Sequence, residues 1–262
     1  MTTLTSAPPR DRGVGPLRSS GIFIGRSLRH SLRDGESMLM AIALPVLLML
    51  VFTFVFGGAI QTEGYVDFVV PGVILTCAGF GASSVAVSVN RDVTLGAMRR
   101  FRTLPIRSAT VLAGHVVASV LRNLVATGVV IGVAIAIGFR PTATPADWLV
   151  ALALVALWIL AITALFAFIG LVSSSPEAAN GYGFGLLFLP YLSSAFVPIA
   201  TMPEWMRPIA THQPINPLVE SLRALLVGQG AAPVGVSLAW CLGIVVTAAA
   251  LIVWGFRRTA RR

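Results

Sequence analysis

Histidine, cysteine and carboxylate side chains are the groups that could hold a metal ion or transfer a proton in this chain. His30, His115 and His212 fall on three separate segments, and Cys77 and Cys241 each lie inside an apolar stretch. None of these residues has the spacing of metal ligands, and no serine lies in a nucleophile–base pattern. We therefore expect this chain to have no catalytic residue, no metal site and no cofactor site of its own.

A Walker A phosphate loop and a Schiff-base lysine are excluded more firmly, because all 19 basic residues are arginine. A Walker A loop requires Gly-Lys-Ser/Thr, and Schiff-base catalysis requires a lysine amine. ATP hydrolysis by this chain alone is therefore not expected.

The elements that carry these residues are predicted to be membrane helices. Hydrophobic residues make up 56% of the 262 positions and charged residues 11%, with a mean hydropathy of +0.87, which excludes an ordinary soluble fold. A bilayer core needs about 20 apolar residues per helix. Long uncharged windows predict six transmembrane helices, at about 38–56, 68–89, 110–137, 148–172, 181–199 and 234–256. The expected fold class is an all-α integral membrane protein.

Arginine distribution predicts the orientation of these spans. Fifteen arginines fall before the first span, in the connection 91–107 or after the last span, whereas the odd-numbered connections carry only Arg140, Arg207 and Arg223. By the positive-inside rule, both termini are cytoplasmic. The net charge of +9 is thus a topology signal, and no nucleic-acid partner is expected.

The segment before the first span divides into two parts. Residues 1–16 are rich in proline and glycine and are interpreted as a disordered cytoplasmic tail. From residue 17 to residue 35 the pattern predicts an amphipathic helix on anionic membrane lipid. Its apolar face contains Leu17, Gly21, Ile24, Leu28 and Leu32, and its basic face contains Arg18, Arg26, Arg29 and Arg33. The alternative is a solvated basic leader that only fixes orientation.

Arg122 is the one ionisable residue well inside a predicted span. Intramembrane charge is costly and usually functional. We interpret Arg122 as snorkelling or pairing between helices, with substrate binding as the alternative. No Asp or Glu lies well inside any span, so the proton relay of a secondary transporter is not expected.

Two connections have helical patterns although neither spans a membrane. In the cytoplasmic connection 91–107, a short helix places Ala97, Met98, Phe101 and Leu104 on one arc and Arg99, Arg100 and Arg102 on the rest, and Pro105 ends it. This helix suits a protein partner or, alternatively, a lipid surface. In the external connection 201–232, one helix is predicted to start at Met202-Pro203-Glu204-Trp205, and a second to run from about Pro217 to Leu226 before Gly228.

These two connections resemble those of the ABC-2 type permeases, and within them the daunorubicin-resistance-like branch. The first stretch reads Arg91-Asp92-Val93-Thr94-Leu95-Gly96, then Leu104-Pro105-Ile106-Arg107-Ser108. The second reads Ser194-Ala195-Phe196-Val197-Pro198, then Met202-Pro203-Glu204-Trp205-Met206, then Pro214-Ile215-Asn216-Pro217, with Arg223 before Gly228. The resemblance covers residues 17–262. One departure is Ala97-Met98, where the family usually has an acidic residue after the glycine.

The resemblance implies the permease subunit of an ATP-driven exporter in a bacterial cell membrane. It would export an amphiphile such as a drug, lipid or glycan precursor, and a separate ABC subunit would bind ATP and magnesium. The implied coupling helix contains Gly96, Met98, Arg99, Arg100, Phe101, Arg102 and Leu104, and the implied external re-entrant region contains Pro203, Trp205, Asn216, Pro217 and Arg223. The alternatives are a membrane scaffold or assembly protein and, less favoured, a proton-coupled transporter.

The resemblance also implies a second permease copy, as a homodimer or heterodimer. Small residues that permit close helix approach occur on the second and fifth spans. They are Gly79, Gly81, Ala82 and Ser83, and Gly181, Gly183 and Gly185. Packing within one subunit is the alternative use of each cluster.

The predicted topology can be tested by cysteine-accessibility labelling. We expect cysteines placed near Gln61 and Thr211 to be labelled from outside the cell, and cysteines near Arg99 and Arg258 to be protected, because arginine-rich connections stay in the cytoplasm. Protection at Thr211, or external labelling near Arg258, would contradict this topology.

Overall fold

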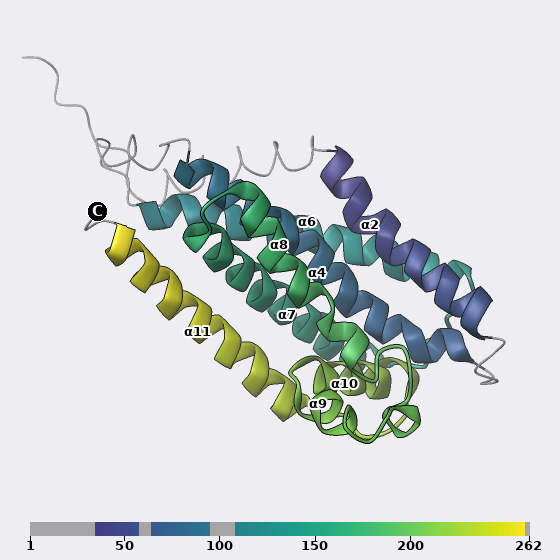
Figure 1. Cartoon of the computed structure of the whole chain (residues 1–262). Helices are drawn as coiled ribbons and strands as arrows, with labels where there is room; N and C mark the ends of the chain where they lie inside the picture. The colour runs from purple at the N-terminus through teal and green to yellow at the C-terminus, as the bar shows by residue number, and fades with distance from the viewer. Residues whose placement is uncertain (1–34, 58–63, 95–107, 260–262) are drawn as a thin grey trace, which may run out of the picture.

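The computed structural model describes residues 35–57, 64–94 and 108–259, in which every regular element is helical (Figure 1). The α-helices are α2 (Gly35–Leu50), α4 (Tyr65–Thr94), α6 (Ser108–Ala136), α7 (Pro145–Val172), α8 (Pro176–Leu187), α9 (Arg207–His212), α10 (Ile215–Val227) and α11 (Val234–Thr259). The shorter turns are a π-helix, η1 (Val51–Phe56), and two 3₁₀ helices, η2 (Leu189–Leu192) and η3 (Ile199–Thr201). The predicted tail (1–16), most of the predicted amphipathic helix (17–35) and the whole predicted coupling helix (96–104) lie outside the described residues.

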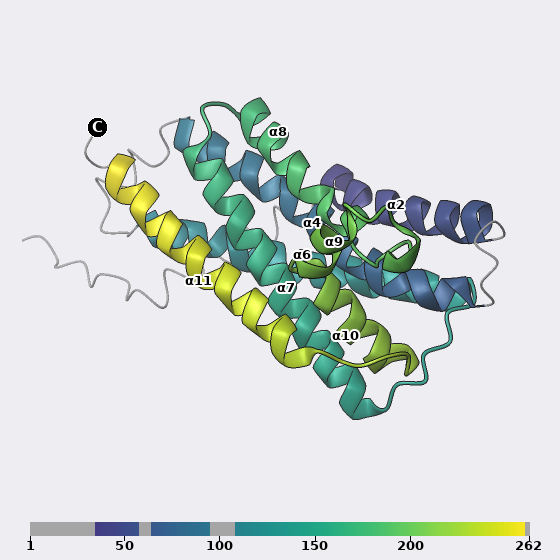
Figure 2. The same ribbon diagram turned by 60° about the horizontal axis from the view of Figure 1, so that its bottom comes forward.

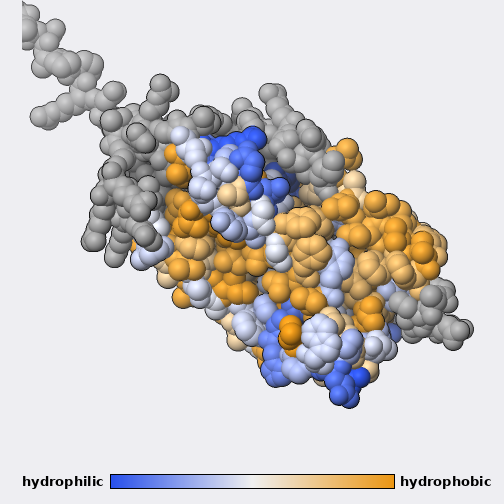
Figure 3. Space-filling model, viewed as in Figure 1, coloured by the Kyte–Doolittle hydropathy of each residue, from blue (hydrophilic) through white to orange (hydrophobic). Residues whose placement is uncertain are grey.

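Four described helices are long and apolar enough to cross a membrane, and they coincide with four of the predicted spans. They are Tyr65–Thr94, Val116–Ala136, Pro145–Val172 and Val234–Gly255. The stretch Ala41–Phe56 is a shorter apolar helix. Figure 3 shows a wide hydrophobic band between more hydrophilic patches on the face in view. This all-helical architecture is that of a multi-pass membrane protein.

The prediction of one continuous helix over 181–199 is wrong. The helix α8 begins at Pro176 and ends at Leu187. Pro190 follows within one turn and lies in η2. Proline has no N–H and its ring crowds the preceding turn, so Pro190 favours a break here, although α2 and α4 continue through Pro45 and Pro71. The backbone is irregular from Ser193 to Pro198, and residues 193–196 are buried in the protein. Burial of this kind is the condition under which non-helical backbone is tolerated at membrane depth.

The helix α4 occupies the centre of the bundle. It packs against α2, α6, α7, α8 and α10, and Figures 1 and 2 show it between α2 on one side and α7 on the other. The apolar window of α4 is 78% buried, whereas that of α11 is 17% buried. We conclude that α4 is the core helix and α11 a peripheral one.

Small residues bring other segments into direct contact with α4. Gly72 lies against the backbone of Ala195, and Gly81 lies against the amide of Asn123 on α6. Near the other end of α4, the backbone of Ala86 touches Gly170 of α7. A Cβ atom at any of the three glycines would overlap its neighbour. Such close approach is how helices without bulky side chains associate in membranes.

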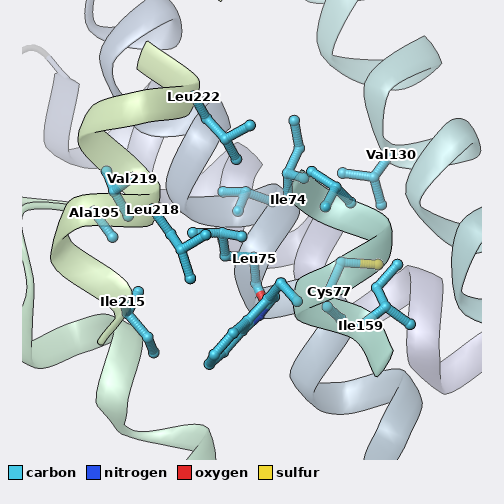
Figure 4. Close-up of a cluster of buried hydrophobic side chains, with 14 of the residues drawn as sticks. Ile74, Leu75, Cys77, Val130, Ile159, Ala195, Ile215, Leu218, Val219 and Leu222 are labelled. Carbon is cyan, nitrogen blue, oxygen red and sulfur yellow. The ribbon is translucent and has the colours of Figure 1, made fainter. Parts of the chain in front are cut away.

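The apolar face of α10 closes the core at the end of the bundle where α4 begins. Leu218, Val219 and Leu222 of α10 are fully buried, as are Ile74 and Leu75 of α4. Figure 4 shows these side chains gathered in one cluster, together with Ile215, Cys77, Val130, Ile159 and Ala195. The buried apolar residues Ile215, Leu218, Leu222 and Leu226 of α10 are three or four positions apart, so this short helix packs as part of the core.

Candidate functional site

We use the term cap for residues 193–228, which contain the irregular segment after η2, the helix α9 and the helix α10. Arg223 of α10 is the central polar residue of the cap and is only 9% exposed. Its Nη2 atom donates to the carbonyl oxygen of Phe68 at 3.1 Å and to that of Ser194 at 2.8 Å. Its guanidinium carbon lies 3.9 Å from the centroid of the Phe68 ring. Arg223 therefore joins α10, α4 and the irregular segment.

The sequence spacing on α10 explains why these groups meet. Asn216, Glu220 and Arg223 are four and three positions apart, which places them on one helix face. The Asn216 amide donates to Oε1 of Glu220 at 2.8 Å and accepts from the N–H of Ser194 at 3.1 Å. Both backbone polar groups of Ser194 thus have side-chain partners on α10, which offsets the cost of burying irregular backbone.

The charge of Arg223 is retained in this setting. Burial lowers the pKa of Arg223 to about 10, and the negative charge of Glu220 acts in the opposite direction. Since this pKa is well above neutral, the guanidinium stays protonated. A protonated guanidinium can donate to two carbonyl oxygens and lie over an aromatic ring at the same time.

Three further hydrogen bonds attach the cap to the bundle. The Tyr65 hydroxyl donates to the carbonyl oxygen of Phe196 at 2.8 Å, and the Gln213 amide donates to that of Leu189 at 3.1 Å. The hydroxyls of Ser221 on α10 and Ser237 on α11 lie 3.0 Å apart. The cap is therefore fixed to α4, to η2 and to α11.

The predicted residues of the external region divide into two groups. Asn216, Pro217 and Arg223 are buried together, whereas Pro203 and Trp205 lie on the surface, with Trp205 71% exposed. The predicted helix start at Met202 is wrong. Pro203 instead opens a turn in which its carbonyl accepts from the N–H of Met206 at 2.9 Å. The helix α9 begins only at Arg207, and Pro208 takes the early helix position that proline favours.

Arg122 lies deep between α6 and α4 and is 6% exposed. Its Nη2 atom donates to the carbonyl oxygen of Gly81 at 2.9 Å and also to the hydroxyl of Ser84. The adjacent Asn123 amide makes a longer contact, 3.4 Å, to the carbonyl oxygen of Ala78. This geometry favours the interhelical pairing of Arg122 over a substrate-binding role, because its donors are directed at α4.

A row of aromatic rings connects α8 to the end of the first apolar helix. We call this set the aromatic row. Its members in order are Phe184, Phe188, Tyr191, Phe196, Phe52 and Phe56. Successive ring centroids lie 5.1, 6.1, 4.9, 4.5 and 5.4 Å apart, within the range of favourable ring pairs. Phe196 is buried, whereas Phe184, Phe188 and Phe56 are exposed. The row therefore offers aromatic surface at both ends.

Comparison of the sequence with known proteins identifies the family of this chain. The sequence matches the ABC-2 type transporter family over residues 20–227. The chain belongs to the ABC-2 type transporter family. It is 31% identical over 261 residues to the daunorubicin resistance ABC transporter permease protein DrrB1 of Streptomyces coeruleorubidus, covering 98% of this chain and 92% of that one. It is 27% identical over 239 residues to the probable doxorubicin resistance ABC transporter permease protein DrrC of Mycobacterium tuberculosis, covering 90% and 87%.

The family and the permease role predicted from the two connections are thereby confirmed. As a permease of this family, the chain is a membrane component of a transporter. Within residues 35–57, 64–94 and 108–259, no three His, Cys, Asp or Glu side chains are grouped to hold a metal ion.

Sequence reasoning missed several residues of this permease that the structure places in the cap network. The carbonyl oxygens of Phe68 and Ser194 accept hydrogen bonds from Arg223, and the Glu220 carboxylate accepts one from Asn216. The three- and four-residue spacing on α10 was a usable signal for Glu220. No local signal could find Phe68, because it is 155 positions away from Arg223.

We predict that Arg223→Met destabilises the cap by about 2 kcal/mol, because two buried carbonyl groups lose a charged donor. Arg223→Lys should have an intermediate effect, since an ammonium group cannot reproduce the planar guanidinium fork. Hydrogen exchange of the α10 backbone amides in detergent-solubilised permease would measure this local stability.

Arg207 supplies the matched control for this measurement. It is exposed and also donates to two backbone carbonyls, those of Met202 and Ala200. Because water can replace those bonds, Arg207→Met should change exchange in α10 little. Equal effects of the two variants would contradict a special role for Arg223.

Proposed function

We propose that this permease is the membrane part of an exporter in which two permease copies pair with two ATP-binding subunits. An amphiphile would cross between the permease copies while the ATP-binding subunits hold ATP and magnesium. Family membership supports this proposal. So does the absence of lysine from the whole chain, since a Walker A loop needs one and transport would then require an energy source on another subunit.

We further propose six crossings with both termini in the cytoplasm. The helix α2 with η1 would make the first crossing, and α8 with the buried segment after it would make the fifth. Figure 1 supports this arrangement, because α4, α7 and α11 all end at one end of the bundle while the cap lies at the other. Together with the arginine asymmetry, this arrangement supports an external position for the cap.

One observation supports the dimer most directly, namely the open face of α8. Gly181 and Gly185 have no neighbouring atom within 4 Å of an added Cβ, and the exposed rings of Phe184 and Phe188 lie on the same helix face. Gly183 is different, because Phe166 fills the space beside it. We infer that a helix of the second copy packs closely against α8 at Gly181 and Gly185.

The other predicted glycine cluster is used within the subunit. Gly79 lies 3.2 Å from the Leu187 side chain, measured from an added Cβ, and Gly81 lies against Asn123. The α4 cluster therefore supports packing inside one permease, which leaves α8 as the stronger candidate for the interface between copies.

We propose that the substrate contains a flat aromatic part. The aromatic row adjoins the open face of α8, and residues 178–203 contain no charged side chain. Aromatic rings offset-stack on other rings, whereas a purely aliphatic chain gains only apolar contact. The names of the two relatives state resistance to daunorubicin and to doxorubicin. These are the observations that favour an aromatic amphiphile over a glycan precursor.

We also propose that the predicted coupling helix, with Gly96, Met98, Arg99, Arg100, Phe101, Arg102 and Leu104, docks the ATP-binding subunit. This segment follows directly on α4, the core helix of the bundle. Movement imposed there would reach the centre of the permease without passing through a peripheral helix.

The proposed interface predicts cross-linking between copies. Cysteines at Gly181 or Gly185 should form intermolecular disulfides in native membranes, because two α8 helices would meet there. Gly243→Cys on α11 is the matched control, since Gly243 also has open space around it but lies on the peripheral helix. The native residues Cys77 and Cys241 are buried and should give little background. More efficient cross-linking at Gly243 than at either α8 position would contradict the α8 interface.

The proposed exporter predicts a specific defect for Phe101→Ala. A large aromatic at an interface centre commonly contributes over about 1.4 kcal/mol, which is about tenfold in affinity. We expect Phe101→Ala to insert normally but to lose most copurification of the ATP-binding subunit and coupled export, whereas Arg99→Ala should be milder. Copurification from membranes and substrate-stimulated ATP hydrolysis are the measurements. Full assembly and export with Phe101→Ala would indicate an interfacial lipid helix instead, and absence of any ATP-binding subunit from wild-type preparations would favour a scaffold protein.

A further inference from the structure

Asn90 is a fully buried amide near the end of α4, at the opposite end of the bundle from the cap. Its Nδ2 atom donates to the carbonyl oxygens of Gly170 and Ser173 at 3.1 and 2.7 Å. The last carbonyls of a helix have no partner within the helix. The Asn90 side chain therefore caps the end of α7 from a neighbouring helix.

A second contact lies one turn away from this hydrogen-bonded pair. The backbone of Ala86 on α4 touches Gly170 on α7 so closely that a Cβ atom at Gly170 would overlap the Ala86 carbonyl. Ala86 and Asn90 are four positions apart on one face of α4, and both contact Gly170, while Asn90 also contacts Ser173, the residue after α7. Two successive positions of α4 therefore hold the end of α7, which opposes sliding of α4 against α7.

The turn between α7 and α8 links the attached end of α7 to the start of α8. It contains only Ser173, Ser174 and Ser175. The Ser173 hydroxyl donates to the carbonyl of Ile169 at 2.6 Å, and the Ser175 hydroxyl accepts from the N–H of Ala178 at 3.1 Å. Because both helix ends are capped and the turn is short, the start of α8 follows the end of α7.

The helix α4 also packs directly against α8, and the charges at this end of the two helices are in keeping with that packing. Glu177 is in the first turn of α8, and its pKa lies below the usual range because of its own backbone N–H, the Ser175 hydroxyl and the positive charge of Arg91. Arg91 is the residue after Asn90 on α4. The exposed surface of α4 at this level therefore faces the start of α8.

We propose that Asn90 is a positioning residue that ties the end of α4 to the start of α8, so that force applied to the end of α4 moves the open face of α8. This inference rests on the proposed function, because the force is that of the ATP-binding subunit on the segment after Thr94. The amide contacts neither substrate nor ATP. It acts through the α7–α8 turn.

The test compares Asn90→Leu with wild type in vesicles containing the permease and its ATP-binding subunit. Leucine keeps the size of asparagine but donates no hydrogen bond. We expect unchanged subunit assembly and ATP hydrolysis, with about fivefold less substrate exported per ATP hydrolysed. Asn180→Leu is the matched control, because Asn180 is an exposed amide on α8, and it should leave this ratio unchanged.

Chemical rescue separates a mechanical role from a general folding defect. In a permease with Asn90→Cys and Ser173→Cys, export per ATP should be low under reducing conditions and should recover when oxidation during purification joins the two neighbouring cysteines in a disulfide cross-link. A variant that assembles but is not rescued by the cross-link would overturn the proposed tie.

Distance measurements on the permease alone distinguish this inference from the proposed function. Spin labels at Thr94 and Tyr182, both exposed, should give a broader distance distribution in Asn90→Leu than in wild type. If wild-type vesicles export nothing, the proposed function fails while this measurement still tests the tie. If distances and export per ATP are both unchanged in Asn90→Leu, Asn90 does not position α8.

Discussion

The arrangement of this permease depends on the close approach of its other segments to α4. At three levels a glycine allows this approach, namely Gly72 against Ala195, Gly81 against Asn123, and Gly170 of α7 against α4 itself. Packing in lipid gains little from the hydrophobic effect, so contact distance matters more than apolar area. A side chain at any of these glycines would displace a backbone or a buried amide. The positions of α6, α7 and the cap relative to one another therefore follow from the small residues along α4.

The irregular segment 193–198 imposes the second constraint. Because α8 ends at Leu187 and residues 193–196 are buried, the backbone groups of this segment need partners inside the protein. Arg223 and Asn216 supply them at Ser194. This explains a charged side chain in a mostly apolar cap. It also shortens α8, so that the aromatic row continues from α8 through the irregular segment to the first apolar helix rather than along one straight helix.

The cap and the Asn90 contact have a common physical form. At each end of α4, a buried side chain donates to two backbone carbonyls: Arg223 to those of Phe68 and Ser194, and Asn90 to those of Gly170 and Ser173. The chain is thus attached to α4 just before α8 begins and again in the irregular segment after it. Between these attachments, an added Cβ at Gly181 or Gly185 would have no neighbour within 4 Å among the described residues. A helix fixed at both ends in this way is suited to follow the movement of α4.

The sequence by itself determined the four long apolar helices and the family, because hydropathy and the motifs near Gly96 and Asn216 are properties of neighbouring residues. The coupling-helix assignment stays a prediction. Only the tertiary structure decided which side chains satisfy the irregular segment 193–198. Local hydropathy predicted one helix over 181–199, and it could not show that the chain becomes irregular after η2. That outcome depends on the hydrogen bond from Arg223 to Phe68, two residues that are 155 positions apart in the sequence. Local composition cannot predict a contact between segments that are so far apart in the chain.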